Sequence, residues 1–167
     1  MMPAPPSPLK PGSAPSVRQK LSWNAIEQAV EALVVPLTTG RPPWQGIVAV
    51  ARGGLAPAAL LACRLGIRRV ETVCVASYDR QRQEAARILK PAAASVVGEG
   101  AGWLVVDDLV DTGQTLALLR RLLPQAGFAV LYAKPAGQGQ VDFWASLAPQ
   151  HTWLVFPWEI GPETDRP

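Results

Sequence analysis

The chain has 167 residues, which suits one domain with its own hydrophobic core and leaves little room for a second domain. Hydrophobic residues make up 49% and charged residues 17%, the balance of an ordinary globular protein. The net charge of +3 weakly favours anionic ligands such as phosphates, and the sequence shows no clustered basic segment, so we do not expect nucleic-acid binding.

The two cysteines, Cys63 and Cys74, lie in a helical and a strand pattern without a CxxC motif. We expect them to be reduced and buried, as small hydrophobic residues of a reducing compartment. The N-terminus lacks the apolar segment of a signal peptide, and no apolar run is long enough to cross a bilayer. The sequence therefore favours a cytoplasmic protein.

Residues 1–20 (MMPAPPSPLKPGSAPSVRQK) differ in composition from the rest of the chain. Their prolines remove amide donors and push neighbouring residues into extended conformations, and few large apolar side chains are present. We expect a Pro-rich disordered tail over residues 1–20 and a folded domain over residues 21–167. A polyproline segment that binds a partner is the alternative interpretation of the tail.

The folded part begins with a helix that Ser22 or Asn24 can cap, and its apolar residues recur with a helical period up to Leu37. Strands and helices then alternate along the chain. We expect strands at residues 46–51, 70–77, 103–108 and 128–133, helices at residues 55–65 and 114–123, and short pairing strands within 141–147 and 152–158. Residues 78–102 look like a mobile excursion from the sheet. This alternation predicts an α/β fold with a mostly parallel central sheet flanked by helices.

Ligands of an open parallel sheet bind at the carboxyl ends of its strands. One candidate loop there is Arg52-Gly53-Gly54, where glycines permit close backbone approach and the arginine adds a charge suited to a pyrophosphate. An ordinary strand-to-helix turn explains the two glycines about as well. A third loop, after residue 133, carries Lys134, which could donate to a ligand carbonyl but by itself would more often be solvated.

The loop between these two carries the strongest signal, the segment DDLVDTGQT at residues 107–115. Asp107 and Asp108 are adjacent carboxylates at the end of a buried strand, and such a pair needs a cation or hydroxyl partners. The following hydroxyls, glycine and helix-start amides form an anion site. Capping of the next helix by Asp111 or Thr112 is the alternative, but it does not explain the aspartate pair. No GxxxxGK[ST] motif accompanies the strand, which excludes a P-loop ATPase.

Together these segments resemble the type I phosphoribosyltransferases, most closely the bacterial xanthine-guanine branch. The resemblance runs from Trp23 to about Gly161 and rests on VARGGLAPAALLACRLGIRRVETVCVASYD, VVDDLVDTGQT, AKPAG and TWLVFPWE. It implies the type I phosphoribosyltransferase fold with a small hood and a flexible loop. It also implies transfer of ribose 5-phosphate from phosphoribosyl pyrophosphate (PRPP) to N9 of a purine, with Mg²⁺ and release of pyrophosphate.

The resemblance implies roles for individual residues. Arg52 and Gly53 would hold the pyrophosphate, Asp107 and Asp108 the ribose hydroxyls, and Asp108 also Mg²⁺. The PRPP-binding segment would continue through Leu109, Val110, Asp111, Thr112, Gly113, Gln114 and Thr115, of which the last five cradle the 5-phosphate. Asp111 would act as general acid/base at the purine N7.

For the base, Lys134 resembles the lysine that donates to the purine 6-oxygen, and Trp153 and Leu154 match the pair that packs on the ring. An ammonium has no acceptor for the 6-amino group of adenine, so the implied substrates are guanine, xanthine and, less well, hypoxanthine. The alternative for Trp153 is a core aromatic near a sheet edge. The lone His151 has no expected chemistry.

Two departures from the family pattern stand out. Glu84 falls where family members carry an arginine, which Arg82 or Arg87 could replace after a small loop adjustment, and Gln114 replaces a common second glycine. A PRPP-sensing regulatory module with the same fold is the alternative function, but no nucleic-acid-binding segment accompanies it. The resemblance also implies a homotetramer, and peripheral association with the inner membrane is known among relatives, although no amphipathic basic helix argues for it here.

Overall fold

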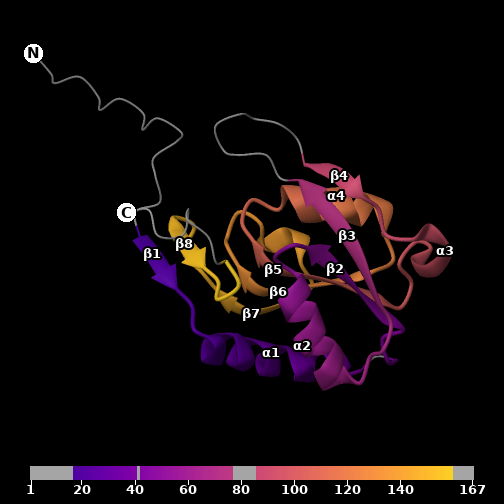
Figure 1. The fold of residues 1–167 in the computed structure, drawn as a ribbon, viewed down its shortest axis with the longest axis horizontal. Helices are drawn as coiled ribbons and strands as arrows, with labels where there is room; N and C mark the ends of the chain where they lie inside the picture. The colour runs from indigo at the N-terminus through magenta and orange to yellow at the C-terminus, as the bar shows by residue number, and fades with distance from the viewer. Residues whose placement is uncertain (1–16, 41, 77–85, 160–167) are drawn as a thin grey trace, which may run out of the picture.

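The computed structural model describes residues 17–40, 42–76 and 86–159 (Figure 1). The helices are α1 (Trp23–Thr38), α2 (Leu55–Leu65), α3 (Ala94–Val97) and α4 (Gln114–Leu122). The strands are β1 (Val17–Lys20), β2 (Gly46–Ala51), β3 (Val70–Ala76), β4 (Arg87–Lys90), β5 (Trp103–Val110), β6 (Gly127–Ala133), β7 (Phe143–Leu147) and β8 (Thr152–Val155). This order confirms the predicted α/β alternation.

The central sheet has six strands in the order β4-β3-β2-β5-β6-β7, and every neighbouring pair except β3 and β4 is parallel. Within this sheet β2 comes first along the chain. The strands β3 and β4 are added on one side of it and β5, β6 and β7 on the other, so β2 and β5 lie adjacent at the centre. In such a sheet the crevice beyond the carboxyl ends of the central strands is the place for a ligand. The loops after β2, β5 and β6 all leave the sheet at this edge.

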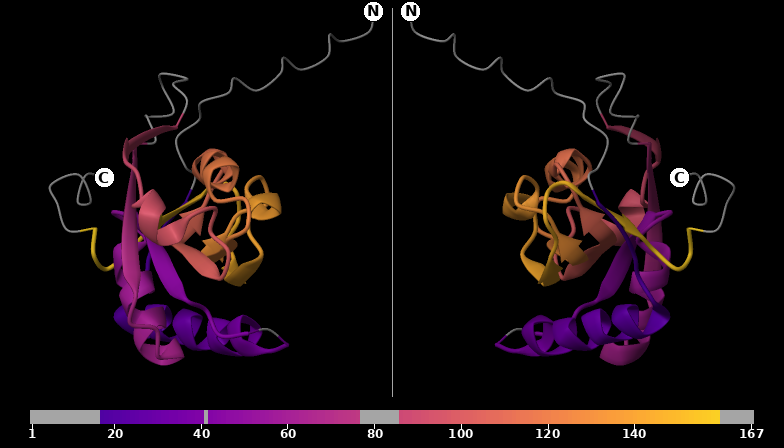
Figure 2. Two further views of the ribbon diagram at one scale, coloured as in Figure 1. Left: turned by 90° about the vertical axis from the view of Figure 1, so that its right-hand side faces the viewer. Right: turned by 90° about the vertical axis from the view of Figure 1, so that its left-hand side faces the viewer.

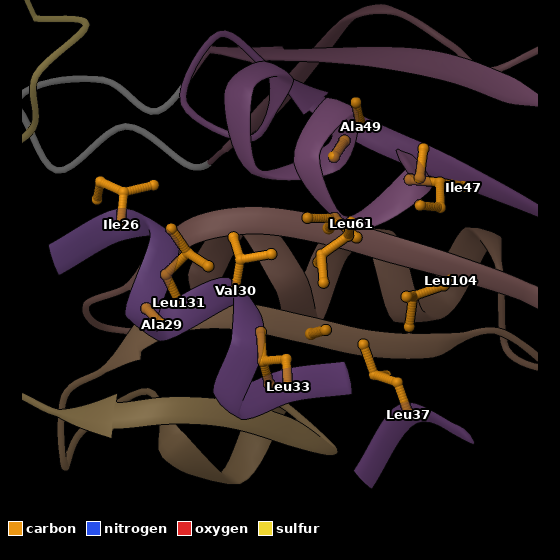
Figure 3. Packing of buried hydrophobic residues seen from close by; sticks show 14 of the residues in the cluster. Ile26, Ala29, Val30, Leu33, Leu37, Ile47, Ala49, Leu61, Leu104 and Leu131 are labelled. Carbon is orange, nitrogen blue, oxygen red and sulfur yellow. The ribbon is translucent and has the colours of Figure 1, made fainter. Parts of the chain in front are cut away.

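Helices cover both faces of the sheet, and this explains why the central strands are apolar on both sides. Ile47 and Ala49 of β2 pack with α1 and α2, whereas Val48 and Val50 belong to the second core on the side of α3 and α4. Figure 2 shows α1 and α2 on one side of the molecule and α4 on the other. Figure 3 shows the first core, where side chains of α1 such as Leu33 meet those of the sheet.

A second sheet of two parallel strands, β1 and β8, lies at the side of the molecule opposite α3 (Figure 1). Val17 pairs with Thr152, and Lys20 pairs with Val155. The segment just before α1 is thereby paired with the strand that carries Trp153. The strand at residues 17–20 corrects the predicted tail: backbone pairing with β8 orders these residues although their side chains are exposed. Residues 1–16 lie outside the described part of the chain.

Other local predictions need correction as well. Ser22, not Asn24, caps α1, since its side chain accepts a hydrogen bond from the Ala25 amide at 3.2 Å. Part of the predicted excursion is ordered, because β4 pairs antiparallel with β3 and α3 follows it. The two C-terminal segments are strands that do not pair with each other: β7 joins β6, and β8 joins β1.

Glu84, which departs from the family pattern, and its candidate replacement Arg82 lie outside the described residues. The other candidate, Arg87, begins β4 with an exposed side chain. Cys63 is exposed on α2 rather than buried, and Cys74 is partly buried in β3; both are free thiols. Within the described residues, no helix has the length and apolar character needed to cross a membrane.

Candidate active site

The aspartate pair lies at the carboxyl end of β5, which runs two residues further than predicted, to Val110. Four buried residues of β5 precede Asp107 and Asp108, so the hydrophobic strand delivers both carboxylates to the ligand edge of the sheet. An Asp107 carboxylate oxygen accepts the Asp108 backbone N–H at 3.0 Å. Leu109 is partly buried beside the first core, and Val110 is buried in the second.

The loop after β2 packs directly against this strand end. A Cβ on Gly53 would collide with the Asp108 carboxylate, and one on Gly54 would collide with backbone atoms of Val50 and Val106. Both glycines are therefore required by close packing of this loop against β2 and β5. Arg52 is exposed at the same edge and follows a cis peptide bond from Ala51. The structure thus brings Arg52, Gly53 and Asp108 together, as the sequence predicted.

The electrostatics of the pair are unfavourable in the absence of a ligand. Burial and the neighbouring Asp108 charge hold the pKa of Asp107 well above its usual range. Burial and the charge of Glu159 raise the pKa of Asp108 from 3.8 to about 6. The Trp158 indole offsets part of this second rise, although its buried N–H does not reach hydrogen-bond geometry with any described residue. A cation or hydroxyl donors at this point would relieve the strain.

The turn after β5 leads into α4 without a side-chain cap. Gly113 is the N-cap, with φ of 85°, and a Cβ there would approach Gln140 Cγ at 2.7 Å. Thr112 and Gln114 are exposed and Thr115 is partly buried. Capping of α4 by Asp111 or Thr112, the alternative interpretation, is therefore wrong. The first amides of the helix remain available to an anion, as at any uncapped helix start.

Lys134 is buried, with 2% of its side chain exposed. The expectation from its residue type alone, a solvated lysine, is therefore wrong. It follows β6, and its Nζ lies 3.4 Å from an Asp111 carboxylate oxygen. Gly137 of the same loop contacts the Asp111–Gly113 turn so closely that a Cβ would meet the Asp111 carbonyl oxygen at 2.8 Å. The loops after β5 and β6 thus form one unit.

A pocket of about 160 Å³ joins these groups to the C-terminal segment. Its lining residues are Asp108, Leu109, Asp111, Lys134, Trp153, Leu154, Phe156 and Glu159. Trp153 is 41% exposed, which rules out the core-aromatic alternative, while Leu154 is buried in the first core. A planar apolar ligand would find an aromatic wall here and charged groups at the opposite end.

Three residues near the pocket were missed by sequence reasoning. Phe156 and Glu159 line it, and the Phe156 backbone N–H donates to a Glu159 carboxylate oxygen at 2.9 Å. Gln150 donates from its amide to Asp111 Oδ1 at 2.8 Å. The first two lie in the TWLVFPWE block at residues 152–159, from which the resemblance assigns only Trp153 and Leu154 to the base. Gln150 carries no sequence signal, because its partner is 39 residues away.

Comparison with known proteins identifies the family. A family model described as a phosphoribosyl transferase domain matches residues 19–165. The xanthine-guanine phosphoribosyltransferase of Nitratidesulfovibrio vulgaris is 46% identical over 140 residues, which cover 83% of each chain. This chain belongs to the phosphoribosyltransferase family.

Solved structures of the same fold agree. A purine phosphoribosyltransferase from Pyrococcus horikoshii matches with a TM-score of 0.72 and 30% identity, covering 87% of this chain and 95% of that one. The xanthine-guanine-hypoxanthine phosphoribosyltransferase of Helicobacter pylori matches with a TM-score of 0.69 and 26% identity, covering 86% and 94%. The predicted family, fold and enzyme class are confirmed, and the regulatory-module alternative is not favoured.

Replacing Asp108 by Asn should stabilise the ligand-free phosphoribosyltransferase at neutral pH. Because the pKa of Asp108 in the folded chain is raised from 3.8 to about 6, the folded chain retains a proton that the unfolded chain has lost. Stability therefore falls as the pH rises through this window. Asparagine has no charge to bury, so we expect a gain of about 1 to 3 kcal/mol in the free energy of unfolding.

The measurement is urea unfolding in the presence of a metal chelator, at neutral pH and at roughly pH 3, where the gain should vanish. Asp142→Asn is the control, because this carboxylate pairs with Arg120 at 2.8 Å and its loss should not stabilise. If the Asp108→Asn variant is no more stable than the unaltered protein at neutral pH, the ionised Asp108 carboxylate does not destabilise the folded chain, and the prediction is wrong.

Proposed function

We propose that the protein transfers the 5-phosphoribosyl group of PRPP to N9 of guanine, xanthine and, less well, hypoxanthine, giving GMP, XMP or IMP and pyrophosphate in purine salvage. The observation that carries this proposal is the pocket in which Asp108 and Asp111 meet Lys134 and Trp153. The first two follow the expected ribose-phosphate pattern, and the last two offer a donor and an aromatic surface to a base. The names of the relatives from Nitratidesulfovibrio vulgaris and Helicobacter pylori point the same way.

The PRPP half of the site would be formed by the loops after β2 and β5. The exposed Arg52 guanidinium and the backbone of Gly53 bind the pyrophosphate, while Asp107 and Asp108 accept hydrogen bonds from the ribose hydroxyls. The uncapped start of α4 and the hydroxyls of its turn receive the 5-phosphate. The phosphate segment runs from Asp111 through Thr112, Gly113, Gln114 and Thr115.

The aspartate pair fits a bound Mg²⁺, since the pKa values of both carboxylates are raised and no lysine or arginine of the described residues pairs with them. Mg²⁺ commonly takes one or two carboxylates and completes its shell with water and substrate phosphate oxygens. Asp108 would hold it, assisted by Asp107. When bound, the ion neutralises charge on the leaving pyrophosphate.

The reaction develops positive charge on the ribose as pyrophosphate leaves, so the chain acts chiefly by positioning and charge stabilisation. The carboxylates of Asp107 and Asp108 favour this charge. Asp111 faces the base pocket and exchanges a proton at the purine N7 while N9 attacks the anomeric carbon. Trp153 and Leu154 hold the ring in line with the ribose.

Selection of the base follows from Lys134. Its ammonium lies in the pocket with 2% exposure and three N–H donors, so it favours a purine with a 6-oxygen. Adenine presents a 6-amino group there and offers the buried ammonium no acceptor at this position of the ring, which a hydrogen-bonding site rejects strongly. By resemblance to the family we also expect a homotetramer. A measurement of the molecular mass in solution would test this.

A direct assay tests the function. The purified protein is mixed with PRPP, Mg²⁺ and guanine, xanthine, hypoxanthine or adenine in turn, and the nucleotide and pyrophosphate are measured. We expect product from the three 6-oxo purines and none from adenine. Failure of all three in correctly folded protein would refute the enzymatic proposal, and equal use of adenine would refute the assigned base class.

Replacing Asp111 by Asn should lower kcat about 10²- to 10⁴-fold, the usual contribution of a general acid or base. The asparagine keeps an oxygen that can accept from Gln150, so folding should be retained. The measurement is steady-state kinetics with guanine together with circular dichroism. Unchanged turnover would remove Asp111 from the proton transfer.

Replacing Lys134 by Met keeps the buried aliphatic stem and removes the donor. We expect kcat/KM for guanine to fall about 10- to 100-fold, the value of a hydrogen bond to a charged group, while discrimination against adenine decreases. Lys90→Met is the matched control, because Lys90 bonds Glu71 and Thr72 on β3 at the other side of the sheet. An unaltered base preference in the Lys134 variant would exclude the 6-oxygen contact.

A further inference from the structure

Gln150, in the turn before β8, joins the two loops that form the base end of the pocket. Its Nε2 donates to Asp111 Oδ1 at 2.8 Å, and its Oε1 accepts the Ala136 backbone N–H at 2.9 Å. Ala136 lies two residues after Lys134 in the loop following β6. The partly buried amide of one glutamine therefore connects the residue assigned to proton transfer with the loop that selects the base.

The orientation of this amide is fixed by its neighbours. A backbone N–H can only donate, so the end that faces Ala136 must be the carbonyl oxygen. The NH₂ end then necessarily faces Asp111. Gln150 consequently presents a donor to the Asp111 carboxylate, and that donor does not depend on the protonation of any side chain.

The two oxygens of Asp111 have different surroundings. Oδ1 accepts from Gln150, whereas Oδ2 lies 3.4 Å from Lys134 Nζ. If Lys134 donates to a purine 6-oxygen, its interaction with Oδ2 weakens as the base binds. The hydrogen bond from Gln150 is not part of that exchange, so it continues to hold Oδ1 when the base binds.

We propose that Gln150 is a positioning residue of the phosphoribosyl transfer, which fixes the Asp111 carboxylate so that Oδ2 exchanges the proton with the purine. The proposal rests on the function proposed above. It predicts that loss of the donor lowers turnover more than PRPP binding, because the described hydrogen bonds of Gln150 reach the Asp111 side chain and Ala136 and not the amides and hydroxyls of residues 112–115. Misplacement of a reacting group by about 1 Å typically lowers the rate about 100-fold.

The decisive variant is Gln150→Glu. Its carboxylate can still accept the Ala136 N–H, so the loop after β6 stays anchored, but it offers Asp111 no donor and faces it with a like charge. Gln150→Met removes both bonds at similar volume and serves as the second variant. Gln28→Ala, on the exposed face of α1, is the control. Thermal melts and circular dichroism establish that each variant is folded.

For Gln150→Glu we expect kcat with guanine to fall about 10- to 100-fold, with KM for PRPP within about twofold of the unaltered enzyme. Gln28→Ala should leave both unchanged. Turnover near that of the unaltered enzyme in Gln150→Glu would mean that the glutamine only anchors the loop, and the proposal would be overturned. A loss confined to KM for PRPP would overturn it as well.

A double-variant cycle tests the route through Asp111. In an Asp111→Asn background, Gln150→Met should change the residual kcat by less than about twofold, because the carboxylate it positions is already gone. Full multiplication of the two losses would show that Gln150 acts elsewhere and would overturn the proposal. If the unaltered protein forms no nucleotide at all, the proposed function fails first, and that result is distinct from an active enzyme whose Gln150 variants behave normally.

Discussion

The site depends on two adjacent, partly buried carboxylates at the end of the central strand. β5 is enclosed between β2 and β6 and covered by helices on both faces, so Asp107 and Asp108 directly follow four buried residues and are themselves partly buried. Burial and mutual repulsion raise their pKa values, and Glu159 adds to the effect on Asp108. A folded chain tolerates such a pair only where ligands compensate it, which is the compromise between stability and activity seen at many active sites.

The neighbouring loops are shaped by the need to approach this strand end closely. Gly53 leaves no room for a Cβ beside the Asp108 carboxylate, and Gly137 leaves none beside the Asp111–Gly113 turn. Because each glycine lacks a Cβ, the backbone of its loop can contact the end of β5 directly. As a result, the groups assigned to pyrophosphate, ribose and phosphate, and Lys134 for the base, come from three different loops and still share one edge of the sheet.

Sequence reasoning succeeded where a local sequence pattern was enough to determine the structure. The alternation of apolar strands and helices predicted the parallel sheet, and the acidic and glycine-rich loops predicted which residues gather at its edge. It was wrong where long-range pairing decided the outcome. Residues 17–20 are exposed along their whole length and form a strand only because β8 supplies hydrogen-bond partners. The burial of Lys134 likewise depends on Asp111, a partner that composition cannot supply.

The same limit applies to the base end of the pocket, and it has a chemical consequence. Asp111 receives Lys134 from one loop and Gln150 from the turn before β8, at a separation of 39 residues for the glutamine. Recognition of the base and transfer of its proton would thus share one carboxylate. A lysine that leaves Asp111 to bind a 6-oxygen also removes a positive charge from the group that must exchange the proton. In the proposed reaction the neutral glutamine would keep the Asp111 carboxylate in place during this change, so that selection of the base and activation of Asp111 would occur in a single binding event.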